Sequence, residues 1–109
     1  MDKHSCRLRY LPLFYKDLED NITYIADKLG NPQAANDLLD AVESAILERV
    51  DDAESFEPYC SLKERRYQYY RIYVKNYVVY YVVIDDEGDD KIMEVRRFLY
   101  KGQNRDVLI

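Results

Sequence analysis

The sequence predicts an α+β fold, a two-layer sandwich in which two helices cover one face of an antiparallel sheet. Two patterns lead to this prediction. Apolar residues recur every three or four positions over residues 13–50, as in amphipathic helices. Tyrosine and β-branched residues then dominate residues 67–84, as in strands. The length of 109 residues suits one domain, so we expect residues 1–109 to form a single unit.

The first two elements are a strand and a helix. Residues 6–11 alternate apolar and charged side chains, which is the period of a half-buried strand. Pro12 ends this strand and suits the first turn of the helix over residues 13–29. That helix has one apolar stripe, which we expect to be buried: Phe14, Leu18, Ile22, Ile25 and Leu29.

A second helix follows after a short connection. Gly30 is a suitable C-terminal cap, and Asn31-Pro32 suits an N-cap followed by the first helical position. The helix is predicted to run to about residue 50, and the short connection predicts an antiparallel hairpin. Its expected buried stripe consists of Ala35, Leu38, Leu39, Val42, Ile46 and Val50.

Three strands form the rest of the sheet, after an irregular polar segment at residues 51–66. They are predicted at 67–74, 77–84 and 91–100, with Lys75-Asn76 as a tight turn in which Asn76 tolerates positive φ. The acidic residues 85–90 form the second connection, and the three strands make an antiparallel meander. The order is therefore β-α-α-β-β-β. Simple alternation in the last strand would place Met93, Val95, Arg97 and Leu99 on one face, and Glu94, Arg96, Phe98 and Tyr100 on the other.

Several classes of function are disfavoured by composition. His4 is the only histidine, so neither a Ser-His-Asp triad nor a histidine-based metal site is expected. Cys6 and Cys60 have no CxxC spacing, and the three glycines form no phosphate-binding loop. The acidic segment 85–90 lacks the ligand pattern of a calcium loop. We therefore expect no metal and no cofactor.

Charge and hydropathy bear on partners and location. The net charge of −5 argues against generic nucleic-acid binding. Residues 63–77 and 91–105 nevertheless hold ten basic residues and only two acidic ones, so a local basic surface is compatible with the sequence. There is no apolar run near the ~18 residues of a membrane span and no apolar stretch of a secretory signal near the N-terminus. A cytoplasmic protein is expected.

Arginine and tyrosine are the remaining residues with recognition chemistry. The chain has 12 tyrosines, which could stack on bases beside arginines that neutralise phosphates. Tyrosine also favours strands and packs well in cores. Arg97, in an otherwise apolar alternation, is either an ion-paired structural residue or a group held for recognition.

The order of elements resembles the RelE/ParE superfamily of bacterial toxins, and so do local motifs over nearly the whole chain. These motifs are Tyr10-Leu11-Pro12-Leu13, Asn31-Pro32-Gln33-Ala34-Ala35, residues 70–81, Val95-Arg96-Arg97-Phe98-Leu99-Tyr100 and Arg105-Asp106. The resemblance implies the toxin of a type II toxin–antitoxin pair, neutralised by an antitoxin whose tail wraps the toxin. An exposed apolar groove between helices and sheet would suit that partner.

The resemblance implies site residues of two kinds. For antitoxin binding they are Phe14, Leu18, Tyr73 and Tyr100, and an exposed strand edge or groove could also favour a homodimer. For catalysis the candidates are Arg71, Arg97, Tyr100 and Arg105, with Glu94 or Tyr100 as an acid or base.

The resemblance leaves the target open, and with it whether the protein is an enzyme. RelE-like members cut messenger RNA in the ribosome, whereas ParE-like members inhibit DNA gyrase. RelE-like enzymes carry an arginine just after the glycine or aromatic residue of the central hairpin, where this sequence has Val78, and the sequence pI is near 4.9. We therefore expect ParE-like inhibition of gyrase. The alternatives are a ribosome-dependent endoribonuclease and a non-toxic, binding-only member.

Overall fold

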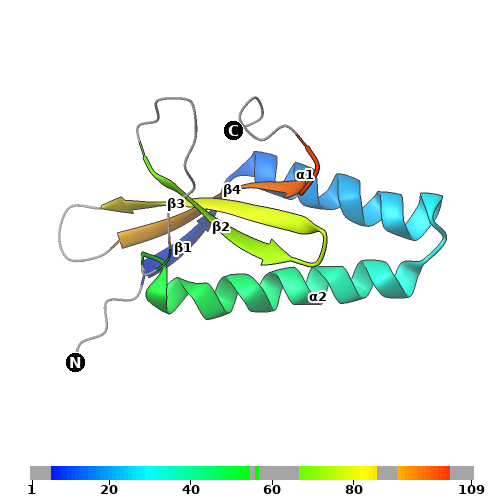
Figure 1. Ribbon diagram of the computed structural model, residues 1–109, viewed down its shortest axis with the longest axis horizontal. Coiled ribbons are helices and arrows are strands. Elements are labelled where there is room, and N and C mark those ends of the chain that lie inside the picture. The colour runs from blue at the N-terminus through cyan, green and yellow to red at the C-terminus, as the bar shows by residue number, and fades with distance from the viewer. Residues whose placement is uncertain (1–5, 55, 57–66, 86–90, 104–109) are drawn as a thin grey trace.

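The computed structural model describes residues 6–54, 56, 67–85 and 91–103. Its element order confirms the predicted β-α-α-β-β-β arrangement (Figure 1). The elements are β1 (Cys6–Tyr10), α1 (Pro12–Thr23), the π-helical turn η1 (Tyr24–Lys28), α2 (Pro32–Arg49), the 3-10 turn η2 (Val50–Asp52), β2 (Tyr69–Val74), β3 (Tyr77–Asp85) and β4 (Lys91–Tyr100). No helix in these ranges is long and apolar enough to span a bilayer.

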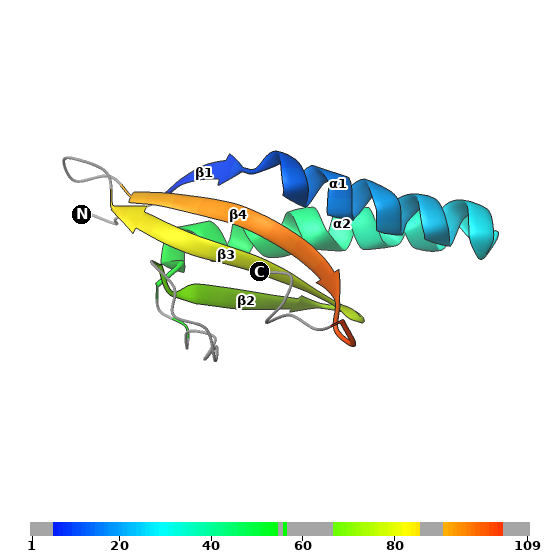
Figure 2. The same cartoon turned by 90° about the horizontal axis from the view of Figure 1, so that it is seen from above.

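The four strands form one mixed sheet in the order β1-β4-β3-β2. β2, β3 and β4 are the predicted antiparallel meander, and β1 pairs in parallel with β4, where Arg9 lies opposite Glu94. Figure 1 shows α2 running along one side of the sheet, and Figure 2, turned by 90°, shows the strands side by side. The parallel pairing places the first strand of the chain against the last one.

The connection between the two helices has the caps that the sequence predicts. The side-chain oxygen of Asn31 accepts a hydrogen bond from the Ala34 N–H, with Pro32 at the first helical position, which is an N-cap. Gly30 has φ 62°, the left-handed conformation that favours glycine at a helix end. In the tight turn between β2 and β3, however, the positive φ belongs to Lys75 (55°) and not to Asn76.

One main core lies between the helices and the sheet. α1 and α2 contribute Phe14, Leu38, Val42 and Ile46, which pack against Val79, Tyr81, Met93, Val95 and Phe98. Leu29 and Leu39 were predicted to be buried with them, but are 59% and 40% exposed. Leu39 is turned by about 100° from Leu38 around the helix axis, and Leu29 follows the last turn of η1. Both therefore lie outside the face that meets the sheet.

The opposite face of the sheet, called here the open face, has a smaller apolar cluster. Its buried residues are Tyr69, Val78, Tyr80, Val82 and Leu99.

A β-bulge in β4 changes which residues reach each face. Tyr80 pairs with Arg97 but Tyr81 pairs with Val95, so Arg96 is an extra residue on β4. The predicted simple alternation is therefore wrong beyond Val95. Phe98 joins Met93 and Val95 on the helix side, whereas Leu99 joins the cluster on the open face.

Candidate functional site

The strand pairing brings two predicted arginines into one row. Arg71 on β2 lies opposite Tyr80 on β3, which lies opposite Arg97 on β4. Tyr80 is fully buried and belongs to the cluster on the open face. The row therefore places the two arginines on that face, separated by one strand. Arg105, the third predicted arginine, lies outside the described residues.

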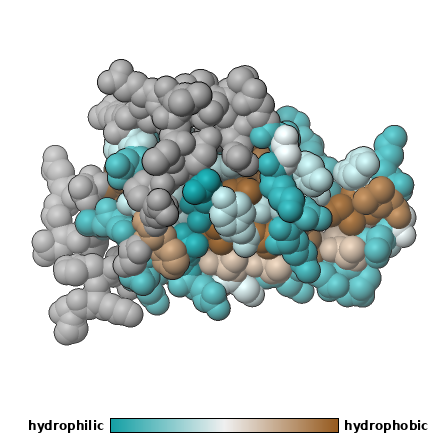
Figure 3. All heavy atoms as spheres, in the orientation of Figure 1, coloured by the Kyte–Doolittle hydropathy of each residue, from teal (hydrophilic) through white to brown (hydrophobic). Residues whose placement is uncertain are grey.

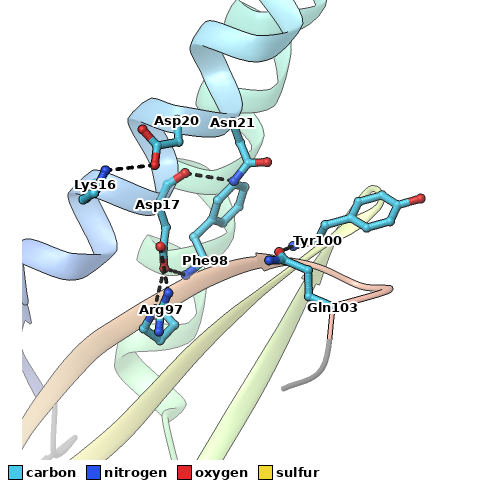
Figure 4. Close-up of polar contacts among 8 residues, drawn as sticks. All are labelled: Lys16, Asp17, Asp20, Asn21, Arg97, Phe98, Tyr100 and Gln103. Carbon is cyan, nitrogen blue, oxygen red and sulfur yellow. Dashed lines mark hydrogen bonds and ion pairs between the residues drawn. The ribbon is translucent and has the colours of Figure 1, made fainter. Parts of the chain in front are cut away.

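Arg97 makes a two-pronged ion pair with Asp17 of α1. Its Nε donates to Asp17 Oδ2 at 2.7 Å and its Nη2 to Oδ1 at 2.9 Å. The backbone N–H of Phe98 also donates to Oδ2, at 3.0 Å (Figure 4). The two side chains are only 14% and 11% exposed. Of the two roles that the sequence allowed for Arg97, the structure therefore shows the ion-paired one.

This ion pair also decides the protonation of Arg97. The hydrogen bonds with Asp17 raise the pKa of Arg97 above its ordinary value, although burial acts in the opposite direction. The guanidinium therefore stays charged and cannot exchange a proton in a reaction near neutral pH. Two of its N–H donors are already used by Asp17.

Glu94, a candidate base, is likewise held by arginines. Its side chain is buried and accepts hydrogen bonds from Arg9 Nε at 2.9 Å and from Arg96 Nε at 2.8 Å. Burial alone would raise the pKa of Glu94, but the hydrogen bonds from the two arginines outweigh it and lower the pKa. A carboxylate with a lowered pKa and occupied oxygens is a weak proton acceptor.

Tyrosine rings surround the arginines of the open face. Arg96 Nη1 donates to the Tyr69 hydroxyl at 3.1 Å, and its guanidinium carbon lies 5.7 Å from the centres of the Tyr67 and Tyr69 rings. The Arg71 guanidinium lies 5.6 Å from the Tyr73 ring. These distances are within the range of cation–π attraction. Tyr73 is 62% exposed, so the rim of this face is available to a partner.

Tyr100 lies at the end of β4, where it shares a polar pocket with Arg97. Its ring is 47% exposed and meets the Tyr77 ring edge-on at 5.8 Å. Its backbone N–H donates to the side-chain oxygen of Gln103 at 2.7 Å (Figure 4). The pocket is also lined by Asp17, Asp20, Asn21 and Tyr24. Arg97 and Tyr100 are thus brought together, whereas Arg71 lies outside this pocket.

A second feature is an apolar groove between the two helices. Two adjacent pockets share Tyr15, Leu18 and Leu39 in their walls and therefore form one groove. Phe14 is 2% exposed and lies at its floor, and Leu18 is partly buried. Figure 3 shows apolar residues reaching the surface between α1 and α2, toward the η1 end. Phe14 and Leu18 thus lie in the groove, while Tyr73 and Tyr100 lie elsewhere.

Two residues of the site, Asp17 and Arg9, could not be recognised from the sequence. Asp17 is 80 positions from its partner Arg97, and Arg9 is 85 positions from Glu94. Both looked like ordinary charges on the polar side of an element. Among the described residues, no three histidine, cysteine or carboxylate side chains gather as in a metal site. Residues 86–90, most of the acidic segment considered for a metal, lie outside the described ranges.

Comparison with known proteins bears on the family. A family model described as "ParE toxin of type II toxin-antitoxin system, parDE" matches residues 8–105. A comparison with curated proteins found no significant match. The matched region includes both helices and the whole meander, and so covers the groove and the arginine row. The chain therefore belongs to the family of ParE toxins of type II toxin–antitoxin systems.

Proposed function

We propose that this protein stops bacterial growth by binding DNA gyrase and inhibiting it in the cytoplasm, with no catalytic reaction of its own. The observation that carries the proposal is the pairing of Arg97 with Asp17. It gives the best-placed arginine of the candidate site a structural role. The family match is consistent with this mode of action.

Cleavage of RNA through its 2′-hydroxyl would need a base, an acid and a group that stabilises the phosphate. In the described part of the chain, Glu94 is bound by two arginines and Arg97 by a carboxylate. Either residue would have to break its ion pair before it could act on a substrate. Breaking a largely buried ion pair costs on the order of 3 kcal/mol, which favours a protein–protein mechanism.

The family also implies an antitoxin as partner. We propose that apolar side chains of the antitoxin enter the groove between α1 and α2, over Leu18 and the edge of Phe14. A helical or extended segment can bury its apolar face in such a groove.

The alternative is a ribosome-dependent endoribonuclease. It is favoured by the row that places Arg71 and Arg97 on one face and by the pocket that Arg97 shares with Tyr100. Under this alternative, loss of the Tyr100 hydroxyl would abolish toxicity. Under the gyrase proposal, Tyr100→Phe keeps its toxicity, because only the ring is needed for contact.

Pulse labelling separates these functions. The chain is induced in bacteria without the antitoxin, and the incorporation of thymidine and of methionine is followed for both wild type and Tyr100→Phe. The proposal predicts that DNA synthesis stops first in both strains. An early stop of protein synthesis, lost in Tyr100→Phe, would establish the nuclease. Unimpaired growth at normal protein level would indicate the non-toxic, binding-only member.

A further inference from the structure

The helix hairpin is strongly acidic. Residues 12–49 contain eight acidic and three basic residues, a net charge of −5. Asp17 is neutralised by Arg97, and Asp20 by Lys16 at 3.2 Å. The other six carboxylates of the hairpin have no ion-pair partner among the residues that the structure describes.

Two of these unpaired carboxylates line the groove defined above. Glu43 lies in the wall of one of its pockets and Glu19 in the wall of the other. The shared centre between them is apolar, with Tyr15 55% exposed and Leu39 40% exposed. The groove is thus an apolar strip with a carboxylate on each of its two halves. Lys16 also lines the half that holds Glu19, but its ammonium group is paired with Asp20.

The negative charge acts inside the groove as well as on its rim. Burial raises the pKa of Tyr10, and the neighbouring Tyr15 and Glu43 raise it further. Tyr10 lies in the same pocket as Glu43. A partner that covers this pocket therefore removes water from a carboxylate that has no ion-pair partner among the described residues. That desolvation is unfavourable unless the partner supplies a positive charge.

We propose that the groove binds a basic amphipathic segment of the antitoxin, with apolar side chains between Tyr15 and Leu39 and lysine or arginine side chains over Glu19 and Glu43. This inference rests on the proposed neutralisation by an antitoxin, to which it adds the chemistry of the partner. An acidic segment with the same apolar residues would be repelled by the hairpin. A neutral segment would leave both carboxylates unpaired.

Two synthetic peptides test the predicted preference for a basic segment, with the full-length protein as the binding partner. Both carry leucine at positions spaced i, i+4, i+7 and i+11, and they differ only in lysine or glutamate on the polar face. Fluorescence anisotropy of labelled peptide gives each Kd. We expect the lysine peptide to bind at least ten times more tightly and to weaken as salt is raised. Equal affinities, or tighter binding of the glutamate peptide, would overturn the proposal.

Charge-reversal variants test whether the peptide binds in the groove. Glu19→Lys combined with Glu43→Lys should lower the affinity for the lysine peptide at least tenfold and raise that for the glutamate peptide. The matched control is Glu48→Lys, an exposed position on α2 outside the groove walls, which should change either affinity less than threefold. Equal effects of the control and the double variant would show that general attraction to the hairpin is responsible, and would refute a specific site.

A cellular assay separates this inference from the proposed target. The double variant should still inhibit growth, but should escape neutralisation by the antitoxin encoded beside the toxin, while Glu48→Lys remains neutralised. If growth inhibition proves to act through the ribosome while escape is observed, the target proposal fails and this inference stands. If the double variant remains fully neutralised, the inference fails whatever the target. Loss of a homodimer in the double variant, seen by sedimentation, would instead assign the groove to a second copy of the chain.

Discussion

Replacing Asp17 by alanine should destabilise the protein far more than any other single change to the surface of α1. Asp17 accepts three hydrogen bonds, two from Arg97 and one from the backbone N–H of Phe98. The variant leaves a guanidinium that is 14% exposed without its carboxylate, and leaves the Phe98 N–H without its acceptor. The loss of folding free energy arises more from leaving these two donors without the Asp17 carboxylate than from the lost attraction between Asp17 and Arg97.

The size of the effect follows from this burial. Removal of one partner from a buried ion pair costs about 3–5 kcal/mol. Because the pair keeps some contact with solvent, we expect the lower end, about 3 kcal/mol. With a urea m-value of about 1.5 kcal/mol per M, the unfolding midpoint should fall by about 2 M at constant m. Asp17→Asn keeps an acceptor oxygen, so we expect about half of this loss.

Urea unfolding followed by circular dichroism measures these changes, and Asp20→Ala is the matched control. Asp20 lies one turn further along α1 and pairs with Lys16, but these side chains are 63% and 68% exposed. Such an exposed i,i+4 pair is worth only about 0.3–0.5 kcal/mol. A double-mutant cycle of Asp17→Ala with Arg97→Ala should give a coupling above about 1 kcal/mol. A loss for Asp17→Ala within about 0.5 kcal/mol of the control, or a coupling near zero, would refute the structural role of Arg97.

Three further predictions use the same assay. Glu94 has a lowered pKa, so its ionised form stabilises the fold above about pH 4.5, and this contribution is lost as the pH falls through the lower folded-state pKa. Glu94→Gln should therefore be less stable than wild type at pH 7 and should lose less stability on acidification. Parallel curves of stability against pH for the two proteins would contradict a lowered pKa of Glu94. Tyr77 has a pKa raised above 10.0, first by burial and then by Tyr100 and Tyr24, so the fold should lose stability as the pH rises above 10. Tyr77→Phe should reduce this loss of stability at alkaline pH. An equal loss in the variant and in wild type would contradict a raised pKa of Tyr77. Leu38→Ala should cost about 2–5 kcal/mol and Leu39→Ala less than about 1 kcal/mol, because the first side chain is 2% exposed and the second 40%; equal losses would show that α2 is rotated from the position described.

Local patterns were sufficient to predict the order of elements and most of their bounds. Helix periodicity, the Asn31-Pro32 cap and the run of tyrosine and β-branched residues each depend on neighbours within a few positions. The exposure of Leu39 could not be predicted so well, because the width of the buried stripe depends on how closely the sheet approaches α2. Local apolar spacing contains no information on that distance.

The candidate site depended on contacts between distant residues. The bulge at Arg96 reverses the alternation of β4, and it is a property of the pairing with β3, which the sequence of β4 alone does not contain. The pairs Arg97–Asp17 and Arg9–Glu94 join residues 80 and 85 positions apart. They form because β1 lies beside β4 and α1 follows directly from β1. The sequence therefore left the partner of Arg97 open, and only the assembled fold brings Asp17 to it.

A purified supercoiling assay tests whether this toxin inhibits gyrase by binding to it. Wild-type protein is added to gyrase, relaxed plasmid and ATP, and in parallel to ribosomes programmed with a defined messenger RNA. We expect inhibition of supercoiling at roughly stoichiometric protein, unchanged in Tyr100→Phe, with the messenger RNA intact. Full supercoiling activity together with cleavage of the ribosome-bound message would contradict it.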